Sequence, residues 1–317
     1  MASSSHQEQT LLRATRHRCA GTVWVVDYDL LERGCGRCAF DVNRARVSNT
    51  RRAERLRADA DVVQKLRDEL NRRRRLPGWV LFSPSADPFV PGAESIRGLA
   101  LKLMALLMSR GVGVTLRTRG GLRQCRGLVN VARRFPGLLR LEIGLFSAEP
   151  KLTESWEAGT AEPTARIALA AEIGAAGGEI VAEVGPIIPF INDADSDIRR
   201  TLRALAGAGI QQVRPTFMED GPGLIQQVER EVSRSRGRLL NGWFRKDDGP
   251  RTGVRRLPSD VRRSRHERVV QLARPLGLRV LACRCMMDDA PTAHACTAGP
   301  SRNPDQRQLS LFDAASL

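Results

Sequence analysis

The stretch that decides the fold runs from residue 179 to residue 218. It begins with the apolar run "EIVAEVGPII" (179–188), continues through "DSDIRRTLRALAGAG" (195–209), and closes with "IQQVRPTFM" (210–218). The middle segment opens with aspartates, suited to capping a helix start, and ends in glycine, a usual helix stop. The pattern therefore predicts a strand, a helix and a second strand, the unit from which parallel sheets are built.

The same alternation occupies most of the chain before this unit. Apolar runs typical of strands and amphipathic segments typical of helices follow one another from Gly21 onward. The other predicted strands are 22–26, 78–83, 113–118 and 139–146, and the other predicted helices are 51–73, 93–111 and 163–178. We therefore expect an α/β fold, a partial (βα)6 barrel over residues 21–220. Functional loops of such folds follow the carboxyl ends of the strands.

Four regions are expected along the chain. Residues 1–20 read as a polar, flexible N-terminal arm, and residues 221–298 as an Arg-rich extension with one helix over 258–276. Residues 299–317 have the composition of a disordered tail, in which "QRQLSLF" (306–312) has the form of a short peptide ligand for a partner. No apolar run reaches the roughly 20 residues that span a bilayer. No apolar leader is evident either, so a cytoplasmic location is expected.

The charge of the chain favours a polyanionic partner. The 317 residues carry a formal net charge of +16, from 51 basic and 35 acidic residues. Such a surplus is typical of proteins that bind nucleic acids or other polyanions. The alternative is a genome-wide bias in composition, because almost all the basic residues are arginine. Aromatic residues make up only 4% of the chain, so a stacking surface for single strands is not evident.

The cysteines raise the question of a metal site. Cys35 and Cys38 stand in "GCGRC" just after the first predicted strand, and three others, Cys283, Cys285 and Cys296, gather near the end. An odd count of seven without a secretory signal disfavours a disulfide framework. An iron–sulfur cluster, a zinc site that uses both groups, a redox pair and ordinary thiols remain open. Cys125, in an amphipathic segment, is expected to be structural.

The order of several motifs narrows these alternatives. Each follows a predicted strand: "DPFVP" (87–91), then Glu157 with Arg166, then "PIIPFIND" (186–193). Together with the cysteine loop they resemble the spore photoproduct lyase-like branch of the radical S-adenosylmethionine superfamily, over about residues 21–215. The resemblance implies a [4Fe-4S] cluster, S-adenosylmethionine and, in an active enzyme, an electron donor such as a flavodoxin or ferredoxin.

The cluster loop departs from the family pattern. On that pattern Cys35 and Cys38 fall on the second and third cysteines, whereas Leu31 stands at the first. Leucine cannot ligate iron, so the cluster needs another ligand, is labile, or is absent. Cys283, Cys285 and Cys296 are candidates for the missing thiolate, and together with the loop they are also candidates for a zinc site.

The remaining site residues are implied by position in the resemblance. Those expected to bind S-adenosylmethionine are Ser83, Ser85, Asp87, Arg166, Asn192 and Asp193. Arg166 resembles an arginine that pairs with the methionyl carboxylate, because a guanidinium fork fits a carboxylate.

Two hypotheses about the function of the chain follow. The chain is a divergent radical protein acting on an unidentified substrate, with nucleic acid one option. Otherwise it is a non-catalytic member that binds nucleic acid or another polyanion.

Overall fold

The computed structural model describes residues 10–17, 21–26, 61–83, 87–91, 93–220, 224–246, 255–282 and 287. Its centre is an eight-stranded sheet in the order β1-β2-β3-β4-β5-β6-β7-β11. β1 and β2 pair antiparallel, and every other pair is parallel. The strands are β1 (Leu12–His17), β2 (Gly21–Val26), β3 (Trp79–Phe82), β4 (Gly113–Thr118), β5 (Leu139–Leu145), β6 (Glu179–Ile187), β7 (Gln212–Phe217) and β11 (Arg279–Val280).

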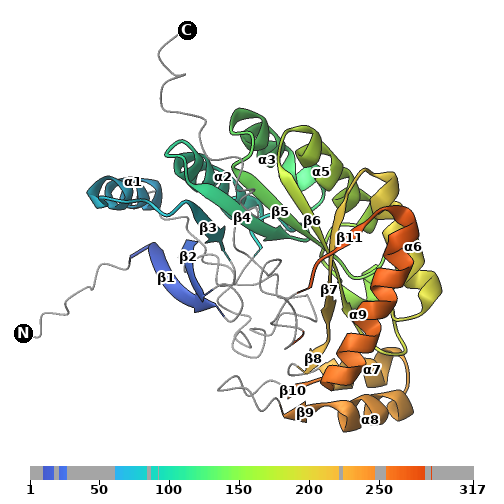
Figure 1. Ribbon diagram of the computed structural model, residues 1–317. Helices are drawn as coiled ribbons and strands as arrows, with labels where there is room; N and C mark the ends of the chain where they lie inside the picture. The colour runs from blue at the N-terminus through green and yellow to red at the C-terminus, as the bar shows by residue number, and fades with distance from the viewer. Residues whose placement is uncertain are drawn as a thin grey trace, which may run out of the picture.

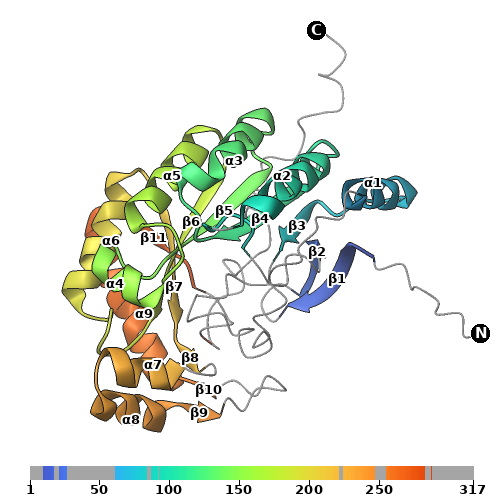
Figure 2. The same ribbon diagram turned by 180° about the vertical axis from the view of Figure 1, so that it is seen from behind.

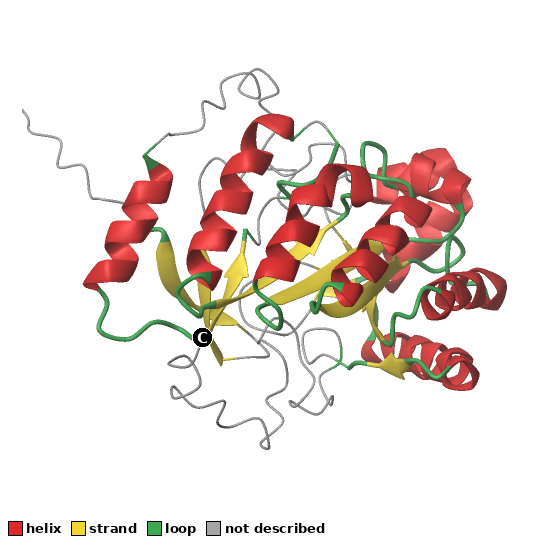
Figure 3. Cartoon of the chain, turned by 90° about the horizontal axis from the view of Figure 1, so that it is seen from above, coloured by secondary structure: helices red, strands yellow, loops and turns green. Residues whose placement is uncertain are grey.

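Helices line the outer side of this curved sheet (Figures 1 and 2). Seen from above, they lie in a row across one face of the strands (Figure 3). The described α-helices are α1 (Val62–Arg72), α2 (Glu94–Met108), α3 (Leu122–Arg134), α4 (Pro150–Trp156), α5 (Pro163–Ala175), α6 (Asp195–Gly207), α7 (Leu224–Glu231), α8 (Arg234–Trp243) and α9 (Ser259–Ala273). Pro150 and Pro163 occupy the starts of α4 and α5, where a missing amide hydrogen costs nothing.

The predicted α/β partial barrel is confirmed. All six predicted strands are present, and β2 to β7 are adjacent and parallel in chain order. The sheet described is open, because β1 and β11 are the two ends of its strand order. A short second sheet, β8 (Glu219–Asp220), β10 (Arg255–Arg256) and β9 (Arg245–Lys246), lies beside α7 and α8 (Figure 1).

β1 of the main sheet was not predicted, and neither were the three short strands of the second sheet. β1 lies inside the segment expected to be a flexible arm. The backbone amides of Leu11 and Leu12 donate to the Glu69 carboxylate of α1 at 3.0 and 3.3 Å, which ties β1 to that helix. β11 comes from the C-terminal extension and pairs with β7, so α9 and β11 continue the alternation past residue 220.

The two faces of the sheet differ in chemistry. The outer face and its helices form the main core, which includes Val114, Leu141, Val184 and Val213. Each of the strands β4 to β7 places one charged side chain on the inner face. These are Arg117, Glu142, Glu183 and Arg214. A second core at the carboxyl end joins Phe146, Trp156, Ile188, Leu240 and Phe244. No described helix is both long and apolar enough to span a membrane.

Candidate functional site

The loop after β3 is anchored to the end of β4 by Asp87. Its carboxylate accepts hydrogen bonds from the backbone amides of Phe89 (3.0 Å) and Arg119 (2.6 Å) and from the Thr118 hydroxyl (2.8 Å). Burial raises the pKa of Asp87, and these donors oppose the shift. The Asp87 carboxylate thus links the loop after β3 to the end of β4. Ser83, just before it, is buried in a left-handed conformation (φ 47°), and Ser85 lies outside the described residues.

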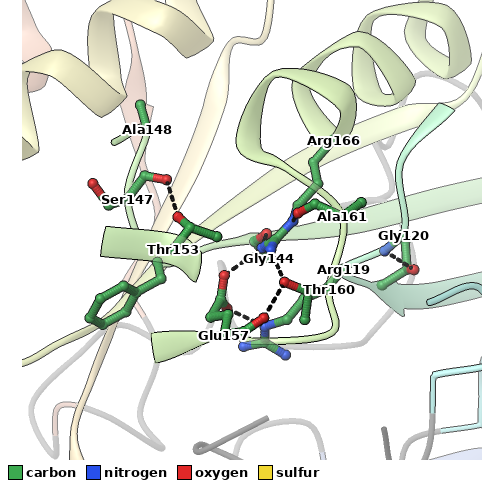
Figure 4. A network of polar contacts seen from close by, with 12 residues as sticks. Arg119, Gly120, Gly144, Ser147, Ala148, Thr153, Glu157, Thr160, Ala161 and Arg166 are labelled. Atoms are coloured by element: carbon green, nitrogen blue, oxygen red, sulfur yellow. Dashed lines mark hydrogen bonds and ion pairs between the residues drawn. The ribbon is translucent and has the colours of Figure 1, made fainter. Parts of the chain in front are cut away.

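Figure 4 shows a charged triad at the carboxyl ends of β4 and β5, formed by Arg119, Glu157 and Arg166. Arg166 is fully buried and donates to Glu157 at 2.6 Å, to the carbonyls of Ala161 (2.6 Å) and Gly144 (2.8 Å), and to the Thr160 hydroxyl. Glu157 receives Nε of Arg119 on its other oxygen, also at 2.6 Å. Arg166 therefore supports Glu157, and Glu157 fixes Arg119.

Arg119 is the member of the triad that retains solvent contact. Its side chain is 25% exposed, whereas Glu157 and Arg166 are at 0%. The stem lies across Gly144, where an added Cβ would come within 3.1 Å of Arg119 Cγ. Glycine at this position of β5 therefore leaves room for the arginine. The methionyl carboxylate partner predicted for Arg166 stays a prediction, while within the chain its carboxylate partner is Glu157.

A second network, the inner ladder (Arg117, Glu142, Glu183 and Arg214), fills the inner face. Both terminal nitrogens of Arg214 contact Glu142, at 3.0 and 2.8 Å, and one also contacts Glu183 at 2.7 Å. Arg117 donates through Nε to Glu142 at 2.5 Å. The arginines lower the pKa of Glu142 well below its usual range and, despite burial, also lower that of Glu183. The two carboxylates in turn raise the pKa of Arg214.

Arg117 and Arg119 form a matched pair at the carboxyl end of β4. Arg117 is in the strand, and Arg119 directly follows its end at Thr118. The Arg119 stem lies over Gly144, two positions after Glu142 on β5, so it is on the same side of the sheet as Arg117. Each is held through Nε by a buried glutamate, and their side chains are 38% and 25% exposed. Two oriented, partly hydrated guanidinium groups provide a setting for a carboxylate or phosphate.

The loop after β6 is also built from predicted site residues. The Asn192 side chain accepts from the Ile188 amide (2.7 Å) and donates to the carbonyls of Phe146 and Pro186 (both 3.0 Å), which joins the ends of β5 and β6. Asp193 accepts from the Phe190 amide at 2.8 Å and pairs with Arg265 of α9 at 2.8 Å. The helix α6 begins after Ala194, so Asp193 closes the preceding turn instead of capping that helix.

The predicted cluster ligands lie outside the described residues. They are Cys35, Cys38, Cys283, Cys285 and Cys296. Among the residues that are described, no group of three or more His, Cys, Asp or Glu side chains could hold a metal ion. Cys125 is buried in α3, and burial raises the pKa of its thiol, as expected for a structural residue.

Sequence reasoning missed the inner ladder and the β4 arginine pair. A signal was present, because β4 reads "GVTLRT" and β5 reads "LRLEIGL", with apolar and polar residues alternating. A parallel strand covered on both faces reads as a continuous apolar run. The alternation therefore indicated a polar inner face, but not which charges would meet across strands.

Comparisons with known proteins place this geometry in a fold class. No known family model matches the sequence. The chain does match solved structures of spore photoproduct lyase. With the enzyme complexed with dinucleoside spore photoproduct, the TM-score is 0.60 at 13% identity, over 86% of this chain and 79% of that one. With a mutant that has bound AdoMet and dinucleoside spore photoproduct, it is 0.53 at 14% identity, over 69% and 65%. The chain thus shares the α/β partial-barrel fold of spore photoproduct lyase.

The sequence relatives are themselves uncharacterised. Proteins of Mycobacterium bovis and Mycobacterium tuberculosis are 29% identical to this chain over 155 residues. The match covers 47% of this chain and 44% of each relative, so it spans less than half of their length.

Proposed function

We propose that the chain is a divergent radical S-adenosylmethionine protein. The observation that carries the proposal is the β4 pair, Arg117 and Arg119, oriented on the inner face of a fold of this type. Enzymes of this fold place their reacting groups at the carboxyl ends of the strands, where β4 ends at Thr118. Cys35 and Cys38 are the cluster ligands in this proposal, with Cys283, Cys285 or Cys296 as the third.

The inner face fits S-adenosylmethionine in charge. The cofactor bears a carboxylate, and Arg117 and Arg119 would hold it by paired hydrogen bonds. Arg166 and Glu157 would keep Arg119 in place, while Asp87, Asn192 and Asp193 would fix the loops around the cofactor. Ser83, just after β3, lies at the same edge of the sheet, and Ser85 is assigned to the cofactor by its position in the sequence alone. When bound, the cluster and the cofactor together supply radical chemistry, and a flavodoxin or ferredoxin supplies the electron.

The decisive experiment is anaerobic reconstitution with iron and sulfide. The proposal expects about four irons and four sulfides per chain, with a reduced electron-spin signal that S-adenosylmethionine perturbs. Cys35→Ala should abolish the cluster, and the equivalent changes at Cys283, Cys285 and Cys296 should identify the third ligand. Cys125→Ala is the matched control, because that buried thiol is in α3 and should leave the iron content unchanged. If the reconstituted chain holds no cluster, the proposed enzymatic function is refuted.

A second candidate is a non-catalytic module for nucleic acid or another polyanion. The net charge of +16 favours it, and the same charge favours a polyanionic substrate if the cluster forms. Titration of a single-stranded oligonucleotide at several salt concentrations tests it, because the slope reports the number of phosphates neutralised. Zinc in place of iron would instead indicate a structural site formed by the cysteines.

A further inference from the structure

The surface of α8 carries an exposed apolar stripe flanked by arginines. Of the large apolar side chains described, only Phe190 (40%), Leu239 (53%) and Val270 (39%) are exposed, and two of these three belong here. Arg236, Leu239 and Trp243 follow helical spacing and share one side of α8. The Trp243 ring lies 5.4 Å from Phe190, and the Arg236 guanidinium lies 5.9 Å from that same ring. We call Phe190, Arg236, Leu239 and Trp243 the α8 surface.

The loop after β6 holds Phe190 in an unfavourable backbone conformation. Its φ is +71°, in the left-handed region that a bulky residue rarely adopts. The amide of Phe190 donates to Asp193, and the neighbouring Asn192 closes the same turn. Strained backbone that is maintained by its surroundings is typical of functional sites. Here it keeps an aromatic ring at the surface, beside α8, although burial in the second core would have removed it from water.

The orientation of α8 is equally fixed. Ser233 caps the helix by accepting from the Arg236 amide at 3.2 Å, and Leu240 is buried in the second core. Gly237 is buried against Glu229 of α7, where an added Cβ would come within 2.3 Å of the Glu229 side chain. The exposed side of α8 is therefore imposed by packing. Arg234 and Arg238 are also exposed, and the ion pairs found within the described residues include neither of them.

We propose that the α8 surface is the docking site of the chain's own segment 308–317, "QLSLFDAASL". This segment carries Leu309, Leu311 and Phe312, followed at once by Asp313. Its apolar residues match the exposed stripe, and its single acidic side chain matches the flanking arginines. In a chain with 51 basic residues, this stretch contains none. The linking residues 288–307 can span about 65 Å when extended.

Two other occupants are less well matched to the surface. A second copy of the described body would bring another strongly basic surface against the arginines of α8, which costs free energy. A nucleic acid would use the arginines and the rings, yet it would leave Leu239, the most exposed apolar side chain of the three, without an apolar partner. A leucine- and phenylalanine-bearing peptide satisfies both the apolar stripe and the charges.

The test uses the full chain and a fluorescent peptide of residues 305–317, followed by anisotropy. In the wild-type chain the native segment competes for the surface. The chain with Leu309→Ala and Phe312→Ala should therefore bind the peptide about tenfold more tightly, equivalent to about 1.4 kcal/mol. Adding Leu239→Gln and Phe190→Asn should remove that binding. Asparagine tolerates positive φ, so the turn is kept. Val270→Gln, at a similarly exposed position on α9, is the matched control and should change nothing.

The outcomes separate the alternatives. Peptide affinity that is equal in the wild-type and tail-substituted chains, or that is unaffected by Leu239→Gln and Phe190→Asn, overturns the proposal. The proposal is also overturned if a single-stranded oligonucleotide displaces the peptide and if binding of that oligonucleotide is lost in Leu239→Gln. If the proposal holds, analytical ultracentrifugation shows whether the docked segment belongs to the same chain or to a second copy. A monomer at all concentrations means docking within one chain, and a dimer that Phe312→Ala dissociates means exchange between two. Neither result depends on whether a cluster assembles.

Discussion

The arginines of the inner face and the arginines of α8 have opposite surroundings. Inside, Arg214 and Arg166 are buried and each meets a buried glutamate at 3.0 Å or less. On α8, Arg234, Arg236 and Arg238 are exposed and pair with none of the carboxylates described. A buried guanidinium without its acid is costly, whereas an exposed one costs little. The buried arginines therefore contribute to the fold and the geometry of the site, whereas the docking proposal assigns the α8 arginines to a partner.

The largest effect should come from breaking the inner ladder. Arg214→Leu removes both bonds to Glu142 and the bond to Glu183, and leaves the buried Glu142 and the partly buried Glu183 with fewer cations. We expect a loss of about 3–5 kcal/mol in the free energy of unfolding, measured in urea. A loss below about 1 kcal/mol would mean that water or movement compensates the charges. That result would contradict the contrast between the two sets of arginines.

The ladder should also make stability depend on acid. The pKa values of Glu142 and Glu183 are lowered in the folded chain by Arg214 and Arg117. A lowered pKa gives stability that is complete above the unfolded value of about 4.3 and is lost as pH falls toward the folded value. Unfolding free energy should therefore drop below about pH 4.5. In Glu142→Gln this drop should be smaller, although the variant is less stable at pH 7.

Asp87 provides a contrast of sign within the same measurement. Burial raises its pKa, so its charged form is less favourable in the folded chain. Its contribution to stability therefore falls as pH rises from the unfolded value toward the folded one, opposite to the ladder. For the ladder itself, the contradicting outcome is a Glu142→Gln variant whose free energy of unfolding falls as steeply with decreasing pH as that of the wild type. The acid sensitivity would then come from groups outside the ladder.

At the β4 pair, substitution should affect ligand binding more than folding. Arg119 is 25% exposed, so Arg119→Gln should cost about 1 kcal/mol or less of stability, because Glu157 keeps its bond to Arg166. Affinity for S-adenosylmethionine, measured by calorimetry on the reconstituted chain, should fall roughly tenfold with the loss of one charge-assisted pair. Arg119→Lys should restore part of it. Equal affinity in wild type and Arg119→Gln would remove Arg119 from the site.

The sequence was sufficient for the architecture because each unit is local. The strand at 113–118 and the two helices predicted to stop near Gly111 and Gly209 follow from apolar spacing and helix stops, and the structure confirms them. The helices end at Met108 and Gly207, and both glycines have positive φ just beyond. β1 was missed although its partner strand β2 is close in sequence; its tie to the helices is through Glu69, which is 57 residues further along the chain than Leu12.

The candidate site was harder to predict because it depends on contacts between strands. Glu157 and Arg166 were placed in one motif, and in the structure their side chains form an ion pair. The position of the Arg119 side chain depends on its hydrogen bond to Glu157, which follows α4 and is 38 residues away in sequence. No local pattern predicts that contact. Ladder partners such as Glu142 and Arg214 are 72 residues apart in sequence and meet only across the sheet.

The smallest effect on stability is expected on α8. Arg238 is exposed and has no ion pair among the described residues, so Arg238→Gln should change the free energy of unfolding by no more than about 0.5 kcal/mol. The same change should weaken binding of the 305–317 peptide to the tail-substituted chain at low salt. At high salt the difference should shrink, because exposed charges are screened. Arg133→Gln, which breaks the exposed 3.5 Å pair with Glu172 between α3 and α5, is the control, with a similarly small stability effect and unchanged peptide binding. If Arg238→Gln destabilised the chain as Arg214→Leu does, the α8 arginines would be part of the fold, and their availability to a partner would have to be abandoned.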